Sequence, residues 1–86
     1  MLLTIIKDDN MVYIDKVGVN VDCSDLPNNF HALQWDGSSG HVEYVGHVDP
    51  NNVITDISAY QVYIDRWNVA RAKQIEERTK KVNNTK

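Results

Sequence analysis

Residues 30–44, Phe-His-Ala-Leu-Gln-Trp-Asp-Gly-Ser-Ser-Gly-His-Val-Glu-Tyr, decide the fold class of this chain. Two runs of strand-forming residues flank the loop 36–39, whose glycine and short polar residues are typical of a β-hairpin tip. A symmetric register also puts one apolar and one mostly polar face on the hairpin, as a half-buried sheet requires. The facing pairs of this register are Trp35 with Gly40, Leu33 with Val42, and His31 with Tyr44.

The residues before the hairpin predict a β-meander of three strands. Residues 2–6 and 11–15 are rich in β-branched and aromatic residues, and turn-forming residues separate them. Residues 17–21 alternate valine with glycine or a polar residue, which indicates a half-buried strand. Turn chemistry throughout residues 22–29 ends the meander.

The hydrophobic period changes after a predicted loop at residues 46–52. From Ser58 to about Thr79 the apolar spacing predicts a helix, with Ser58 and Gln61 forming a capping box. The apolar stripe becomes polar past Ala70. We therefore expect the first half of the helix to pack on the sheet and the second half to project.

Together these segments predict an α+β fold, in which an antiparallel sheet of about five strands carries one C-terminal helix on one face. We expect a single domain at residues 1–79 and a frayed basic tail at residues 80–86. Trp35 of the hairpin and Trp67 of the helix are expected in mutual or near contact. The predicted core residues are Leu33, Trp35, Val42, Tyr44, Tyr60, Ile64 and Trp67.

Length and composition limit what this domain can contain. The chain has 86 residues, of which 42% are hydrophobic and 24% charged, an ordinary globular composition. A chain of this size buries only about 60–65% of its unfolded surface, so one thin core with little room for a large pocket is expected. The single cysteine, Cys23, excludes an internal disulfide and agrees with a reducing compartment.

Charge is divided unevenly along the chain. Residues 1–56 carry a net charge of −7, whereas residues 57–86 carry +4. Such a division can indicate a nucleic-acid-binding arm. Cations also stabilise the C-terminal end of a helix, however, and an acidic body repels phosphates. We therefore favour the structural interpretation and do not expect nucleic acid as a partner.

The residue types that carry catalysis do not form a recognised constellation. His41, Glu43, His47 and Asp49 lack a known metal-ligand spacing, so no metal site is predicted. Cys23 lies among acidic residues, which raise a thiol pKa and disfavour a nucleophilic thiolate. Glycine-rich phosphate loops are absent from the sequence. We predict neither enzymatic activity nor a cofactor.

A second apolar stripe on the helix suggests a protein interface. Its valines and alanine lie opposite the predicted core stripe, and basic residues flank them. Scattered surface valines are common, so this stripe can also be an ordinary solvated face. If the helix only covers the sheet, the polar sheet face around Gln34, His41 and Glu43 is the alternative interface. The predicted interface residues are Val62, Arg66, Val69, Arg71, Ala72 and Lys73.

The chain also resembles a group of small proteins encoded among the tail genes of tailed bacteriophages. The resemblance rests on residues 26–37, followed by Gly-His-Val-Glu-Tyr at 40–44. Val-Tyr-Ile-Asp at 12–15, Asn-Val-Ile-Thr-Asp at 52–56 and the Tyr, Trp and Ala of the helix at 60–70 extend it. It covers most of the chain and implies a phage setting, but it implies no catalytic residues.

The expected function is therefore a non-catalytic, protein-binding component of a bacteriophage tail or of its assembly. The alternative is a phage-encoded inhibitor that binds a host protein, for which the acidic body would provide electrostatic steering. We expect other phage structural proteins and further copies of the chain as partners, and no membrane span. The expected location is the virion tail, or the host cytoplasm during assembly.

Overall fold

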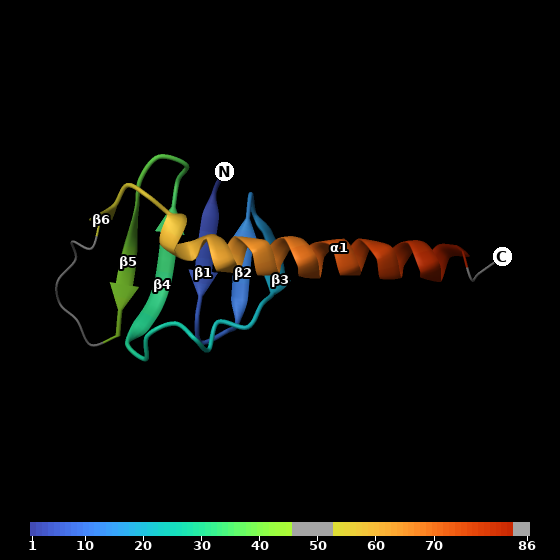
Figure 1. Ribbon diagram of the computed structural model, residues 1–86, viewed down its shortest axis with the longest axis horizontal. Helices are drawn as coiled ribbons and strands as arrows, with labels where there is room; N and C mark the ends of the chain where they lie inside the picture. The colour runs from blue at the N-terminus through green and yellow to red at the C-terminus, as the bar shows by residue number, and fades with distance from the viewer. Residues whose placement is uncertain (46–52, 84–86) are drawn as a thin grey trace.

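The computed structural model describes residues 1–45 and 53–83, with side chains described as far as residue 77. One antiparallel sheet of six strands carries a single C-terminal helix on one face (Figure 1), which confirms the predicted α+β fold. The elements are β1 (Leu3–Ile6), β2 (Met11–Ile14), β3 (Val17–Asn20), β4 (Phe30–Trp35), β5 (Gly40–Tyr44), β6 (Val53–Ile54), the 3-10 helix η1 (Ser58–Tyr60) and helix α1 (Gln61–Asn83).

The strand order is β3-β2-β1-β4-β5-β6, so the predicted meander and hairpin lie side by side. β6 is a sixth strand that the sequence did not predict. It consists of Val53 and Ile54, which pair with His41 and Gly40 of β5. Two residues are too few to show a periodic pattern, so only the pairing reveals this strand. The predicted loop at 46–52 lies outside the described residues.

The core lies between the sheet and the helix, and β1 is at its centre. β1 pairs with β2 on one side and with β4 on the other. Ile5 is flanked by Val12 of β2 and Leu33 of β4, and all three side chains are fully buried. The N-terminal strand therefore joins the meander to the hairpin.

The hairpin formed by β4 and β5 departs from the predicted register at one end. Trp35 faces Gly40 and Leu33 faces Val42, as predicted, but Phe30 and not His31 faces Tyr44. A β-bulge between Phe30 and Ala32 causes this shift. The extra residue turns Phe30 into the core and leaves His31 exposed, which buries a large aromatic side chain in place of an imidazole.

Two tight turns show the backbone conformations that their residues favour. Asp15 and Lys16 connect β2 to β3 with φ angles of 49° and 73°, as expected for a two-residue hairpin turn. At the β4–β5 tip, Gly37 has a φ of 110°, a conformation that glycine adopts without a steric penalty. The Asp36 carboxylate accepts hydrogen bonds from the backbone N–H groups of Ser38 and Ser39 at 3.0 and 2.9 Å.

The helix begins differently from the predicted capping box. The N-cap position is Ile57, which has no side chain that can cap the helix. Asp56, one residue earlier, accepts a hydrogen bond from the Ser58 N–H at 2.8 Å and another from the Ser58 hydroxyl at 3.1 Å. The Gln61 amide instead donates to Asp65 one turn further along α1. η1 precedes the α-helix, and α1 continues to Asn83, so residues 80–83 of the expected frayed tail are helical.

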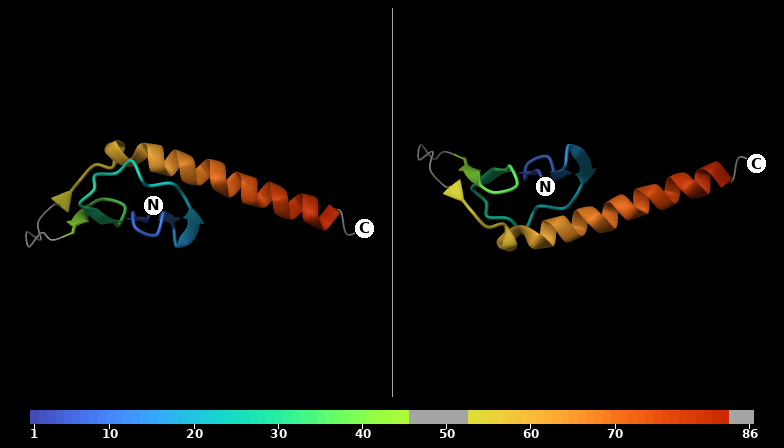
Figure 2. Two further views of the ribbon diagram at one scale, coloured as in Figure 1. Left: turned by 90° about the horizontal axis from the view of Figure 1, so that it is seen from below. Right: turned by 90° about the horizontal axis from the view of Figure 1, so that it is seen from above.

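Helix α1 crosses the sheet and continues far beyond it. It packs against β2 and β3, and its C-terminal half extends past β3, as Figure 1 shows. Figure 2 shows two layers, with the helix on one side and the opposite face of the sheet uncovered. The molecule measures 56 × 25 × 17 Å, and the projecting helix accounts for the long dimension.

The two tryptophans lie over different strands of the core. Trp35 is nearly buried on β4, whereas Trp67 is half-buried and donates its indole N–H to the Val17 carbonyl of β3 at 3.0 Å. β1 and β2 lie between β3 and β4. The sequence predicted mutual or near contact of the two indoles. Both belong to one core, but Trp67 holds the helix to the edge strand β3, and Trp35 lies on β4, three strands away.

Candidate protein-binding surface

The part of the helix beyond the sheet is the most unusual feature of this small protein. Ala70 is the last residue of α1 that packs against the core. Residues 71–83, called the overhang below, continue the helix for roughly 20 Å at about 1.5 Å per residue. A helix of this length is marginal without tertiary packing. The overhang therefore presents a helical surface whose stability would increase on contact with a partner.

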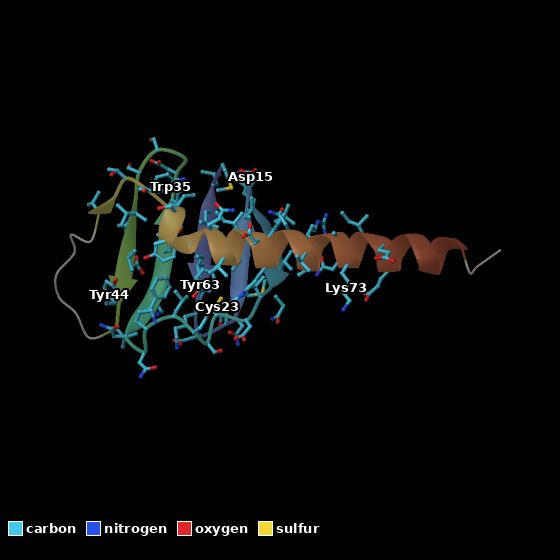
Figure 3. The ribbon with its side chains drawn as sticks, in the orientation of Figure 1. Asp15, Cys23, Trp35, Tyr44, Tyr63 and Lys73 are labelled. Carbon is cyan, nitrogen blue, oxygen red and sulfur yellow. The ribbon has the colours of Figure 1, made fainter. Side chains whose placement is uncertain are left out.

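Four of the six predicted interface residues face outward in the structure, and Arg66 and Arg71 do not. Val62 and Val69 are 44% and 70% exposed, and Ala72 is also exposed. Lys73, which Figure 3 labels on the helix beyond the sheet, is exposed as well. These four residues lie on the side of α1 that faces away from the sheet. Ile75, which the sequence interpretation did not include, is 50% exposed on the overhang, but it lies one turn after Arg71 and not on this outward side. An outward apolar strip thus exists along the helix.

Arg71, the fifth predicted interface residue, is half-buried at the start of the overhang. Its guanidinium donates to the Gln74 side chain at 3.4 Å. Both residues continue the sheet-facing side of α1 after the apolar stripe ends at Ala70. The underside of the overhang therefore begins with polar and positively charged side chains, and Ile75, one turn after Arg71, adds an apolar side chain to it.

Arg66, in contrast, is engaged within the chain. Its guanidinium makes two hydrogen bonds to the Asp25 carboxylate at 2.9 and 3.0 Å and a third to the Asp22 carbonyl at 2.9 Å. It also lies over the Tyr63 ring, with the guanidinium carbon 5.1 Å from the ring centroid. Arg66 therefore fastens the loop between β3 and β4 to the helix, a role that the sequence did not indicate.

Tyr63 completes this cluster by donating its hydroxyl to Asp25 at 3.0 Å (Figure 3). The hydrogen bonds from Arg66, aided by that from Tyr63, lower the pKa of Asp25 to about 2. Burial, together with the Asp25 hydrogen bond, raises the pKa of Tyr63 to about 12. These shifts belong to an ion-pair cluster that holds the helix in place, which is a structural role.

The Asp25 cluster predicts a loss of stability in acid. The Asp25 pKa is lower in the folded protein than its ordinary value of 3.8, so the cluster stabilises the fold fully above that value. The contribution falls as the pH decreases through about 2. Urea unfolding at a series of pH values should show a stability gap between wild type and Asp25→Asn that closes in this window. A gap that stays constant from neutral pH to pH 2 would contradict the assigned pairing.

The predicted core residues lie where the sheet meets the helix. Leu33, Trp35, Val42 and Ile64 are buried. Tyr44, Tyr60 and Trp67 are partly buried and pack against the same cluster. The sequence interpretation left out much of the core, including the residues contributed by β1 and by the loop after β3. These additional buried residues include Leu3, Ile5, Val12, Val19, Cys23, Leu26 and Phe30.

Cys23 is fully buried, and its thiol donates to the Val21 carbonyl at 3.2 Å. Burial, together with the negative charges of Asp22 and Asp25, raises the pKa of the Cys23 thiol. Both effects disfavour the reactive thiolate. Cys23 therefore has the properties of a packing residue.

The face of the sheet opposite α1 carries a broad hollow of about 830 Å³. Tyr13, Gln34 and His41 are among the residues that line it, and Thr4 donates to Gln34 there at 3.0 Å. The thin core has no room for such a volume, so the hollow lies on the open surface. His41 also lies 3.4 Å from Glu43, but the described residues contain no group of three or more side chains that could hold a metal ion.

Comparisons with known proteins identify no relative of this chain: no family model, no curated protein and no solved structure matches it. Among the described residues, no helix is both long enough and apolar enough to cross a membrane.

Proposed function

We propose that this protein is a non-catalytic, protein-binding component of a bacteriophage tail or of its assembly. The observation that carries the proposal is the helix that leaves its own sheet while exposing an outward apolar strip. Val62 and Val69 lie on that strip at 44% and 70% exposure, and Ala72 and Lys73 continue it. Two valines one heptad apart on a rigid helix provide an anchor for a hydrophobic groove on another protein.

The energetics support docking of this helix. Burying a valine side chain contributes about 1.5–3 kcal/mol, and binding to the native state stabilises a protein by mass action. A domain this small has a thin core, so it gains proportionally more from a partner than a larger domain does. The sequence resemblance to proteins encoded among phage tail genes supplies the setting of the proposal.

The central test combines a helix variant with particle analysis. The double substitution Val62→Asp plus Val69→Asp adds two charges to exposed positions, so the fold should be retained, as measured by far-UV circular dichroism. Wild-type protein should be found in purified virions, or bound to a tail protein during assembly, by mass spectrometry. The double variant should be missing from both.

A matched control separates the effect of losing the apolar surface from the effect of adding charge. The pair Asn28→Asp and Asn29→Asp also adds two negative charges, at exposed loop positions far from α1 along the chain, and its incorporation should equal that of wild type. Normal incorporation of the helix variant would overturn the assignment of this surface.

The uneven charge favours one second candidate, an inhibitor that binds a host protein. The net charge of −7 on residues 1–56 would attract a basic host partner at long range. Affinity purification from infected cells distinguishes the candidates, because an inhibitor is recovered with a host protein and is absent from particles.

A further inference from the structure

The two ends of the sheet have complementary shapes, and this complementarity does not involve the outward apolar strip of the helix. At one end, β3 is an edge strand and the overhang runs on past it. At the other end, β5 and β6 lie beyond the start of α1, whose backbone comes closest to β2 and β3 (Figure 1). One end has helix without sheet. At the other end β5 and β6 have no part of α1 above them, and the nearest helical residue on that face is Tyr60 of η1, which packs on Phe30 beside Tyr44.

The backbone of β3 can accept another strand. The two-residue turn at Asp15 and Lys16 makes Ile14 and Val17 a hydrogen-bonded pair, so Val17 and Val19 direct their backbone groups toward β2. The backbone hydrogen bond from the Val21 N–H to the Asn10 carbonyl at 2.9 Å shows that every second residue of this segment bonds toward β2. The N–H and C=O groups of Gly18 and Asn20 therefore point outward, toward the space beside the sheet.

The far end presents the matching surface. β6 is the other edge strand, and the alternating directions of the six strands make it antiparallel to β3. When copies are placed in line with the same face up, β6 of one therefore meets β3 of the other in antiparallel orientation. On the helix side, Ile54 and Tyr44 are only partly buried at this end.

Charge favours the same contact. Residues 71–83 of the overhang carry a net charge of +3, and Arg71 lies on its underside where the helix leaves the core. The body of the next copy, residues 1–56, has a net charge of −7. At about 4.8 Å between strands, an overhang of roughly 20 Å is long enough to cover β6 and β5 of that copy.

We propose that copies of this chain associate head to tail, with β3 of one copy pairing with β6 of the next and the overhang covering the helix-side face of the next copy's β5 and β6. The partner is a second copy of this chain. This contact rests on the proposed function and names one partner for it. It is made by the edge strands and the underside of the overhang, whereas the contact with a tail protein is made by the outward apolar strip. Such a heterologous contact forms a ring or an open filament, depending on the rotation between copies.

The test uses variants blocked at one end each. Asn20→Pro removes an outward-pointing N–H from β3, which an edge strand tolerates. Val53→Lys places a charge on β6 at a position that is 64% exposed. Light scattering of concentrated wild-type protein should show masses above the 9.8 kDa monomer. Each variant alone should be monomeric, and an equal mixture of the two should form a 1:1 dimer and nothing larger, because only one pair of intact ends remains.

Three results would overturn the inference. They are a monomeric wild type, a blocked variant that still self-associates, or a mixture that does not dimerise. If Asn20→Pro does not fold, Val17→Lys blocks the same edge at a residue that is 37% exposed. Asn28→Lys adds the same charge in an exposed loop and should associate like wild type. Amide hydrogen exchange gives a direct readout, since association should protect the Gly18 and Asn20 amides. A monomer that still enters particles would refute this contact and leave the proposed function intact.

Discussion

Phe30→Ala should destabilise the protein by about 3–5 kcal/mol, a large share of the ~5–15 kcal/mol that stabilises an ordinary domain. Phe30 is 1% exposed and joins the sheet to the start of the helix. Its ring lies 6.3 Å from that of Tyr44 on β5 and 6.2 Å from that of Tyr60 in η1. Removing it leaves a cavity at the point where three elements meet. Urea unfolding followed by circular dichroism measures the loss.

His31→Ala is the matched control for this substitution. The bulge leaves His31 exposed, so its truncation should cost less than about 0.5 kcal/mol. In the symmetric register predicted from the sequence, His31 and not Phe30 would face Tyr44. Equal effects of the two substitutions, or a larger effect at His31, would show that the bulge is not present in solution.

Gly40→Ala should cost about 3 kcal/mol, although it adds only one methyl group. A Cβ at Gly40 would collide with the Gln34 carbonyl oxygen and lie 2.9 Å from the Trp35 Cα. Both obstacles are backbone atoms of the paired strand β4, so the hairpin itself must shift. The thermal unfolding midpoint should fall accordingly, and the change should be visible in a single melting curve.

Gly18→Ala is the comparison for this substitution, because its added methyl group would collide with a side chain and not with the backbone. A Cβ at Gly18 would come within 2.6 Å of the Tyr13 ring, which can rotate toward the open face of the sheet. The expected cost is about 1 kcal/mol, close to that of a mild overpacking substitution. If Gly18→Ala proves as destabilising as Gly40→Ala, the Tyr13 ring is held more firmly than its position on the open face indicates.

Local signals were sufficient for the hairpin and the meander. Turn residues at 36–39 and at Asp15–Lys16 specify the backbone geometry of the chain reversal, and alternation then sets which side chains face the core. The register was wrong only at the bulge, because a bulge reflects competition between Phe30 and His31 for a buried position. That competition depends on η1, which supplies Tyr60 from far along the chain.

The candidate surface was only partly predictable for a related reason. The periodicity of α1 placed Val62 and Val69 on an outward side, which follows from helix geometry alone. It also grouped Arg66 with them, because nothing near Arg66 in the sequence shows that Asp25 will lie beside it. Two residues 41 positions apart form that ion pair, so only the folded arrangement of the loop and the helix reveals it.

The sequence by itself determined the fold class, the two hairpin turns and the amphipathic start of the helix, because each depends on residues within a few positions of one another. The tertiary structure alone decided that β1 lies between the meander and the hairpin, that Trp67 bonds to the edge strand β3, and that β3 and β6 are the outer strands of the sheet among the described residues. Those features depend on which distant segments share one core. They result from the packing of the whole chain, in which burial of the largest apolar area outweighs any single local preference.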